Sequence, residues 1–172
     1  MSTSSLIYLK TEENSSSFYY GFKNCFYRHY DGMPEVTGHD IAKIIQEGIS
    51  TIKNEMRIYK KTMWLDKYLS ERFKADKNFE LLYTTKDYHT DIDQLGNIKK
   101  RYYVNYKYFI SLRSTFYEND FNSPIIQVVA DDESIFNDTY DEYRSWLVSR
   151  VKTYYIKAKL IEKHKGESIY EK

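Results

Sequence analysis

The segment Arg101–Leu112, with the sequence RYYVNYKYFISL, constrains the fold more than any other part of the chain. Apolar and aromatic side chains alternate along it with the period of two that a β-strand produces. One face would carry Tyr102, Val104, Tyr106, Tyr108 and Ile110. The other face also holds aromatic side chains, which indicates an interior strand or a strand covered on both sides. The chain is therefore expected to build a sheet around this segment.

Four other segments have the apolar and aromatic content of strands. They are Leu6–Leu9, Ser17–Tyr30, Phe79–Thr84 and Ile125–Ala130. The first two are close enough along the chain to form a hairpin. After the last of them, the acidic run Asp131–Glu133 predicts a solvated turn that leads directly into a helix.

Three helices are predicted from apolar spacing and capping residues. The first would run from Thr37, its cap, to about Gly48, where the glycine ends or kinks it, and the second from about Ile49 to Phe73. The third begins at Asp138, and its apolar residues recur at intervals of three or four, as one helix face requires. These residues are Tyr140, Tyr143, Leu147, Val151, Tyr154, Ala158 and Ile161.

Together these elements predict a single α+β domain over residues 1–172, with a largely antiparallel sheet and helices packed on one of its faces. A chain of 172 residues can bury about 70% of its unfolded surface, so it needs neither a metal nor a disulfide for stability. The polar N-terminal residues and the tail 165–172 are expected to be frayed.

Composition excludes several classes of protein. The 26 basic and 25 acidic residues give a net charge of +1, which is not that of a polycation or an acidic tail. No apolar run approaches the ~18 residues of a membrane span, and Cys25 is the single cysteine, so a disulfide scaffold is excluded. No signal-peptide pattern opens the sequence, which predicts a cytoplasmic protein. Phosphate-loop, zinc-helix and nucleophile-elbow motifs are missing, so neither a cofactor nor a metal is expected.

The segment Tyr27–Asp40, YRHYDGMPEVTGHD, places polar residues between a strand and a helix, and three interpretations of it stay open. His29, Asp31 and His39 can act as catalytic groups or bind a divalent metal. Arg28, with His29, can instead hold a phosphate or carboxylate. The third interpretation is structural, because Asp-Gly-x-Pro is a turn sequence whose polar side chains bond to the turn itself.

This segment resembles the Y-R-H-x-D-G-x-P-x-x-x-G motif of small uncharacterised proteins from bacteriophages, prophages and related mobile elements. A later aromatic strand of those proteins is similar to Val104–Tyr108. The chain departs from the motif at Met33, where an aromatic residue is expected. The resemblance covers the first third of the chain and that strand. It implies a phage-type origin, a location in the host cytoplasm and a shared fold, but no reaction.

Tyrosine is the second unusual feature, since 19 tyrosines and nine phenylalanines bring the aromatic content to 17%. An AT-rich genome or the preference of tyrosine for strands would explain the excess, and so would a surface that contacts a partner. In the last helix, Trp146 and Tyr155 fall outside the apolar stripe, which makes them candidate partner-binding residues. The alternative is that another element covers them.

These observations favour a small non-enzymatic phage or mobile-element protein that acts by binding. Its target would be a host protein, such as one of an antiviral defence system, or a nucleotide signal that such a system uses. The first alternative is a small metal-dependent or hydrolytic enzyme built on Arg28, His29, Asp31 and His39. A weaker alternative is a nucleic-acid-binding protein that uses tyrosine stacking and the basic last helix. The sequence does not determine the oligomeric state.

Overall fold

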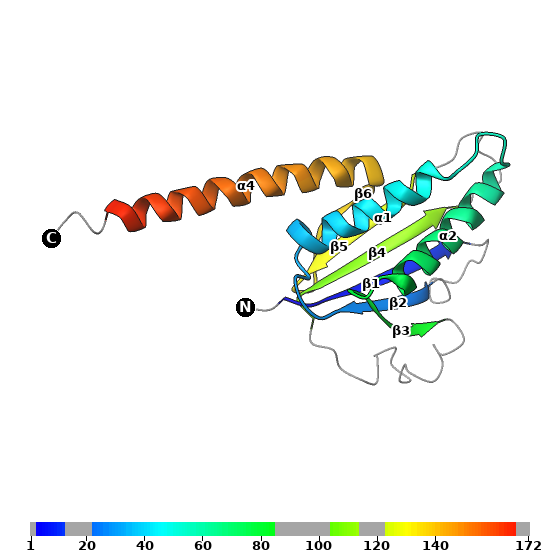
Figure 1. Cartoon of the computed structure of the whole chain (residues 1–172), viewed down its shortest axis with the longest axis horizontal. Helices are drawn as coiled ribbons and strands as arrows, with labels where there is room; N and C mark the ends of the chain where they lie inside the picture. The colour runs from blue at the N-terminus through cyan, green and yellow to red at the C-terminus, as the bar shows by residue number, and fades with distance from the viewer. Residues whose placement is uncertain (1–2, 13–21, 85–103, 114–122, 168–172) are drawn as a thin grey trace.

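A computed structural model of the chain describes residues 3–12, 22–84, 104–113 and 123–167. Its centre is a six-stranded sheet with the order β3-β2-β1-β4-β5-β6 (Figure 1). The strands are β1 (Ser5–Glu12), β2 (Phe22–Arg28), β3 (Glu80–Thr84), β4 (Tyr106–Arg113), β5 (Ile125–Ala130) and β6 (Glu133–Thr139). Neighbouring strands are antiparallel except β1 and β4, which are parallel. The prediction of an α+β fold with a largely antiparallel sheet is confirmed.

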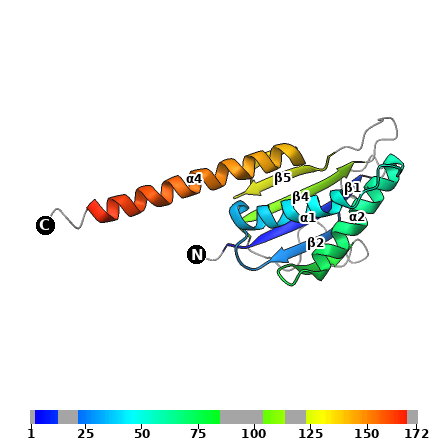
Figure 2. The same ribbon diagram turned by 45° about the horizontal axis from the view of Figure 1, so that its top comes forward.

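The helices lie on one face of this sheet (Figure 2). They are α1 (His39–Ser50), α2 (Ile58–Ala75) and α4 (Tyr140–Glu167), and a short π-helix, Pro34–Gly38, precedes α1. The main core fills the space between the sheet and the helices, where Ile7, Phe26 and Tyr108 from the strands meet Ile45 and Leu69 from the helices. Burial of these side chains stabilises the layered fold.

The opposite face of the sheet carries a second apolar cluster. Leu6, Cys25 and Tyr27 are buried there, with Val104 packed against them. Cys25, the single cysteine of the sequence, is a small buried side chain in this cluster. Strand β4 is interior, as predicted, and Tyr106, Tyr108 and Ile110 contribute to the helix-side core. Val104 precedes β4 and belongs to the opposite face, and Tyr102 lies outside the described residues.

The boundary predicted at Gly48 is wrong. Helix α1 continues through this glycine to Ser50, and a Cβ atom at position 48 would lie 2.6 Å from a Leu65 methyl group and 2.8 Å from the Tyr68 ring. Gly48 therefore allows α1 to pack closely against α2, and it does not end the helix. The second helix starts at Ile58, because the chain needs 51–57 to turn back along the sheet.

Strand β6 was not predicted. The acidic run after β5 is a solvated turn, as expected, but it leads into this strand and not into a helix. Asp131 and Asp132 have φ angles of 49° and 63°, and together they form a two-residue hairpin turn. Aspartate tolerates this left-handed backbone region better than most residues, which was the local sign of a hairpin.

Helix α4 has two different parts. Tyr140, Tyr143 and Leu147 are buried against the domain, so the predicted stripe is confirmed for these residues. The second half of the helix extends past the end of the sheet (Figure 1). From Tyr154 onward the side chains are outside the description, so the inward role of Tyr154, Ala158 and Ile161 stays a prediction.

Candidate functional site

Arg28, the last residue of β2, is tied into the structure by three contacts. Its side chain is only 10% exposed, and its Nη1 donates to Oδ2 of Asp40 in the first turn of α1. Its Nε donates to the carbonyl oxygen of Tyr30 at 3.0 Å, and the guanidinium lies 5.4 Å from the ring centroid of Phe79. The cation therefore links β2, the following turn and α1, and its charge is already paired within the chain.

The Asp-Gly-x-Pro turn is also held by internal bonds. The amide of Gly32 donates to the carbonyl of Thr3 at 3.1 Å, and its own carbonyl accepts a 2.8 Å hydrogen bond from the buried Tyr108 hydroxyl. The hydroxyl of Thr37, which was expected to cap α1, donates to the carbonyl of Asp31 at 2.6 Å from inside the π-helix. These contacts fasten the turn to β1, β4 and the π-helix.

The remaining candidates for chemistry are dispersed. His29 is exposed, and its ring lies 5.0 Å from that of Tyr27, which belongs to the cluster on the sheet face opposite the helices. Asp31 is exposed, with a φ of 57°. His39 begins α1, and its Nε2 is buried without a hydrogen-bond partner among the described residues. Across the described parts of the chain, no three His, Cys, Asp or Glu side chains are grouped so that they could hold a metal ion.

The pKa values of two phenols beside this segment, the buried Tyr108 and the half-buried Tyr106, are raised. Burial raises the pKa of Tyr108 far above its ordinary value, with a smaller contribution from Tyr143 nearby. Burial and then the carboxylate of Glu35 raise the pKa of Tyr106. Glu35 is paired with Arg150 of α4 at 2.8 Å, which joins the π-helix to that helix. Tyr108 thus stays protonated and donates its hydroxyl proton to the Gly32 carbonyl.

Of the two predicted partner-binding residues, only Trp146 has a described side chain. Its ring lies 5.0 Å from Phe136 of β6 and 5.8 Å from Tyr143, and the guanidinium of Arg150 lies 5.0 Å from its centroid. Trp146 is half-buried, and the element that covers it is β6, which sequence reasoning missed. Tyr155 lies in the part of α4 whose side chains are outside the description.

An exposed aromatic side chain is instead found on α2. Leu65, Leu69 and Phe73 of this helix are buried at intervals of four, which leaves Met63 and Trp64 off the stripe with exposed fractions of 59% and 42%. The interval of four between the buried residues was the sequence signal that Met63 and Trp64 lie outside the buried stripe.

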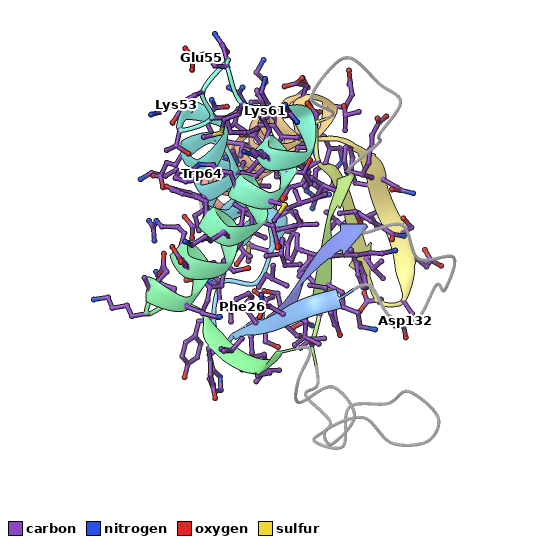
Figure 3. All side chains as sticks on the ribbon, turned by 90° about the vertical axis from the view of Figure 1, so that its right-hand side faces the viewer. Phe26, Lys53, Glu55, Lys61, Trp64 and Asp132 are labelled. Atoms are coloured by element: carbon purple, nitrogen blue, oxygen red, sulfur yellow. The ribbon has the colours of Figure 1, made fainter. Side chains whose placement is uncertain are left out.

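Trp64 is held in place although its ring is exposed. The indole Nε1 donates to Oγ1 of Thr51, in the turn after α1, at 2.9 Å. Lys60 and Lys67 are exposed four positions before and three positions after it, so they lie on the same side of the helix. Lys53 and Lys61 lie at the same end of the molecule as Trp64, with Glu55 nearby (Figure 3). The name α2 surface is used below for Lys53, Lys60, Met63, Trp64 and Lys67.

Comparison with known proteins does not point to a particular activity: no family model, curated protein or solved structure matches the chain. Among the described helices, none is both long and apolar enough to cross a membrane.

Proposed function

We propose that the protein acts by binding a partner protein, and that the α2 surface makes the contact. The observation that carries this proposal is Trp64, which is 42% exposed and has its indole oriented by Thr51. An aromatic ring that is already fixed loses little conformational freedom when a partner covers it, and it offers a large contact area. The neighbouring Met63 extends the apolar area and adapts to the shape of the partner.

The charges around this apolar centre indicate the chemistry of the partner. Lys53, Lys60 and Lys67 are exposed, and Lys67 pairs with Glu71 on the same helix at 4.0 Å. A complementary surface would place an apolar pocket over Trp64 and carboxylates around the pocket. Such charge pairs speed association and make it sensitive to salt.

The resemblance of the segment Tyr27–Pro34 to bacteriophage and prophage proteins suggests a host protein as the target, with a protein of an antiviral defence system as the first candidate. A nucleotide signal or an anionic substrate would need an available cation beside the motif. Arg28 is paired with Asp40 and the Tyr30 carbonyl, which favours the protein target over those alternatives.

A pair of matched variants tests this proposal. A photo-crosslinking residue at position 63 is used to capture the host target, and its affinity is then measured for Trp64→Ala and for Tyr30→Ala. Tyr30 is a suitable control because it is also a large aromatic residue, 64% exposed, in the motif segment. Trp64→Ala is expected to weaken binding by about 10- to 100-fold, the range of an aromatic hot spot, while Tyr30→Ala leaves it unchanged.

The opposite pattern, with binding lost in Tyr30→Ala and kept in Trp64→Ala, would move the site to the motif. If Trp64→Ala instead abolishes binding to single-stranded nucleic acid, and that binding falls steeply with salt, the partner is a nucleic acid and the protein-target proposal is wrong.

A further inference from the structure

Charge is unevenly distributed over the last third of the chain. Residues 131–142 contain no lysine or arginine, and their acidic residues are Asp131, Asp132, Glu133, Asp138, Asp141 and Glu142. In residues 143–165 Glu162 is the single acidic residue, and the basic ones are Arg144, Arg150, Lys152, Lys157, Lys159, Lys163 and Lys165. The β5–β6 hairpin and the start of α4 are thus acidic, and the rest of α4 is basic.

The structure exposes the acidic region. Asp131, Asp132 and Glu133 lie at the turn between β5 and β6, so only Asp138, Asp141 and Glu142 lie at the start of α4. All the carboxylates of residues 131–142 belong to exposed residues. The basic second half of α4 continues beyond the sheet, away from the acidic start of the helix (Figures 1 and 2). One molecule therefore carries opposite charges at the two ends of a single helix, a pattern that a second copy in reverse orientation would complement.

A second line of residues runs along α4 next to the predicted apolar stripe, with which it shares Val151 and Ala158. Its members are three or four positions apart: Asp141, Arg144, Val148, Val151, Tyr155, Ala158, Glu162 and Lys165. The centre of this line is apolar, and each end is charged. Val148 is 51% exposed, although a valine in a helix is normally placed against other apolar groups. We propose that a second copy of the chain binds along this line, with its α4 antiparallel to the first.

The register follows from the positions on the two helices. A twofold axis near Thr153 pairs Val148 with Ala158 of the second copy and Val151 with Tyr155. The same axis brings Arg144 to Glu162 and Asp141 to Lys165. Every charged position then meets the opposite charge, as at the flanking positions of antiparallel coiled coils.

A parallel pair would have the opposite consequence. In a parallel pair, each charged position would lie beside the same position of the second copy. These positions are Asp141, Arg144, Glu162 and Lys165. Like charges at such spacing destabilise a helix pair. An isolated helical segment that leaves the domain is also marginal in water without tertiary contacts, so pairing provides the packing that the sheet does not. The charges thus select the antiparallel dimer.

Sedimentation equilibrium of the full chain at low salt tests the proposal, because it needs no partner other than the protein itself. The wild-type chain is expected to be a dimer that weakens as salt is added. Val148→Glu is expected to raise the dimer dissociation constant at least ~50-fold, since it buries two charges at the centre of the pair. Circular dichroism and the melting temperature establish that each variant is folded.

A charge exchange tests the orientation. The change Arg144→Glu places a carboxylate opposite Glu162 of the second copy at two symmetric positions. It is therefore expected to raise the dimer dissociation constant about fivefold. Adding Glu162→Arg to the same chain is expected to restore the wild-type value, which a parallel dimer would not do. Lys152→Glu, with the same charge reversal at an exposed position off the line, is the control and should change little. A wild-type monomer at all accessible concentrations, or a double variant that stays as weak as Arg144→Glu, would overturn the proposal.

Discussion

The segment Arg28–Asp40 and the α2 surface differ in how their side chains are used. The first is rich in residues that carry chemistry, yet Arg28, Thr37 and the Gly32 carbonyl are all occupied by bonds within the chain. The second belongs to a helix with an irregular apolar pattern, yet it presents a fixed and exposed Trp64. The difference teaches that residue type identifies a possible site, whereas availability depends on what the rest of the chain places next to it.

Gly32→Ala should destabilise the protein more than the other changes, because Gly32 lies in the turn of the motif segment itself. A Cβ atom at this position would lie 2.5 Å from the carbonyl carbon and 2.7 Å from the carbonyl oxygen of Ser4. This carbonyl accepts hydrogen bonds from the amides of Asn105 and Tyr106, so it cannot move aside easily. The free energy of unfolding is expected to fall by about 3 kcal/mol or more, as measured by denaturant titration.

Gly48→Ala is the matched control for that change. The atoms it would meet belong to the Leu65 and Tyr68 side chains, which can shift, and alanine favours the helix. Its loss of stability should therefore be smaller. Equal stabilities of Gly32→Ala and the wild type would mean that the turn is not held against β1 in solution.

Arg28→Met should cause the next largest loss of stability. The size of the loss distinguishes a cation that holds the fold together from one that is available to a ligand. The change leaves the Tyr30 carbonyl and the Asp40 carboxylate without their donor, although Asp40 is half exposed and regains water. We expect a loss of about 2 kcal/mol. Lys107→Met breaks the exposed pair with Asp132 and is expected to cost less than about 1 kcal/mol.

A double-mutant cycle with Asp40→Asn completes the measurement on Arg28. The coupling between the two residues should account for much of the loss, because they contact each other directly. Additive losses would show that Arg28 stabilises the turn by another route and leave its charge free for a ligand.

His29→Ala should have the smallest effect. The imidazole is exposed and contributes ring contacts with Tyr27 and Tyr30, so the loss is expected to stay near 0.5 kcal/mol. The melting temperature should hardly change, and target binding should be kept. Lost binding in a fully stable His29→Ala variant would make the motif segment the functional site and reverse the comparison with the α2 surface.

Local sequence patterns determined the element types in this protein, because strand alternation and helical spacing come from backbone geometry. The alternation in Arg101–Leu112 predicted the interior strand that the structure shows as β4, and the spacing of Tyr140, Tyr143 and Leu147 predicted the packed side of α4. Strand β6 was missed because only Phe136 and Thr139 of its residues are even partly buried, so its sequence has almost no apolar alternation.

Contacts between distant parts of the chain set which polar and aromatic residues are available. Arg28 meets Asp40 because α1 begins above the end of β2, and Trp146 is covered because β6 brings Phe136 beside it. Trp64 stays exposed because α2 turns Leu65, Leu69 and Phe73 toward the sheet. Each of these outcomes depends on contacts between residues distant in the chain, and a local pattern cannot contain them because it describes only near neighbours.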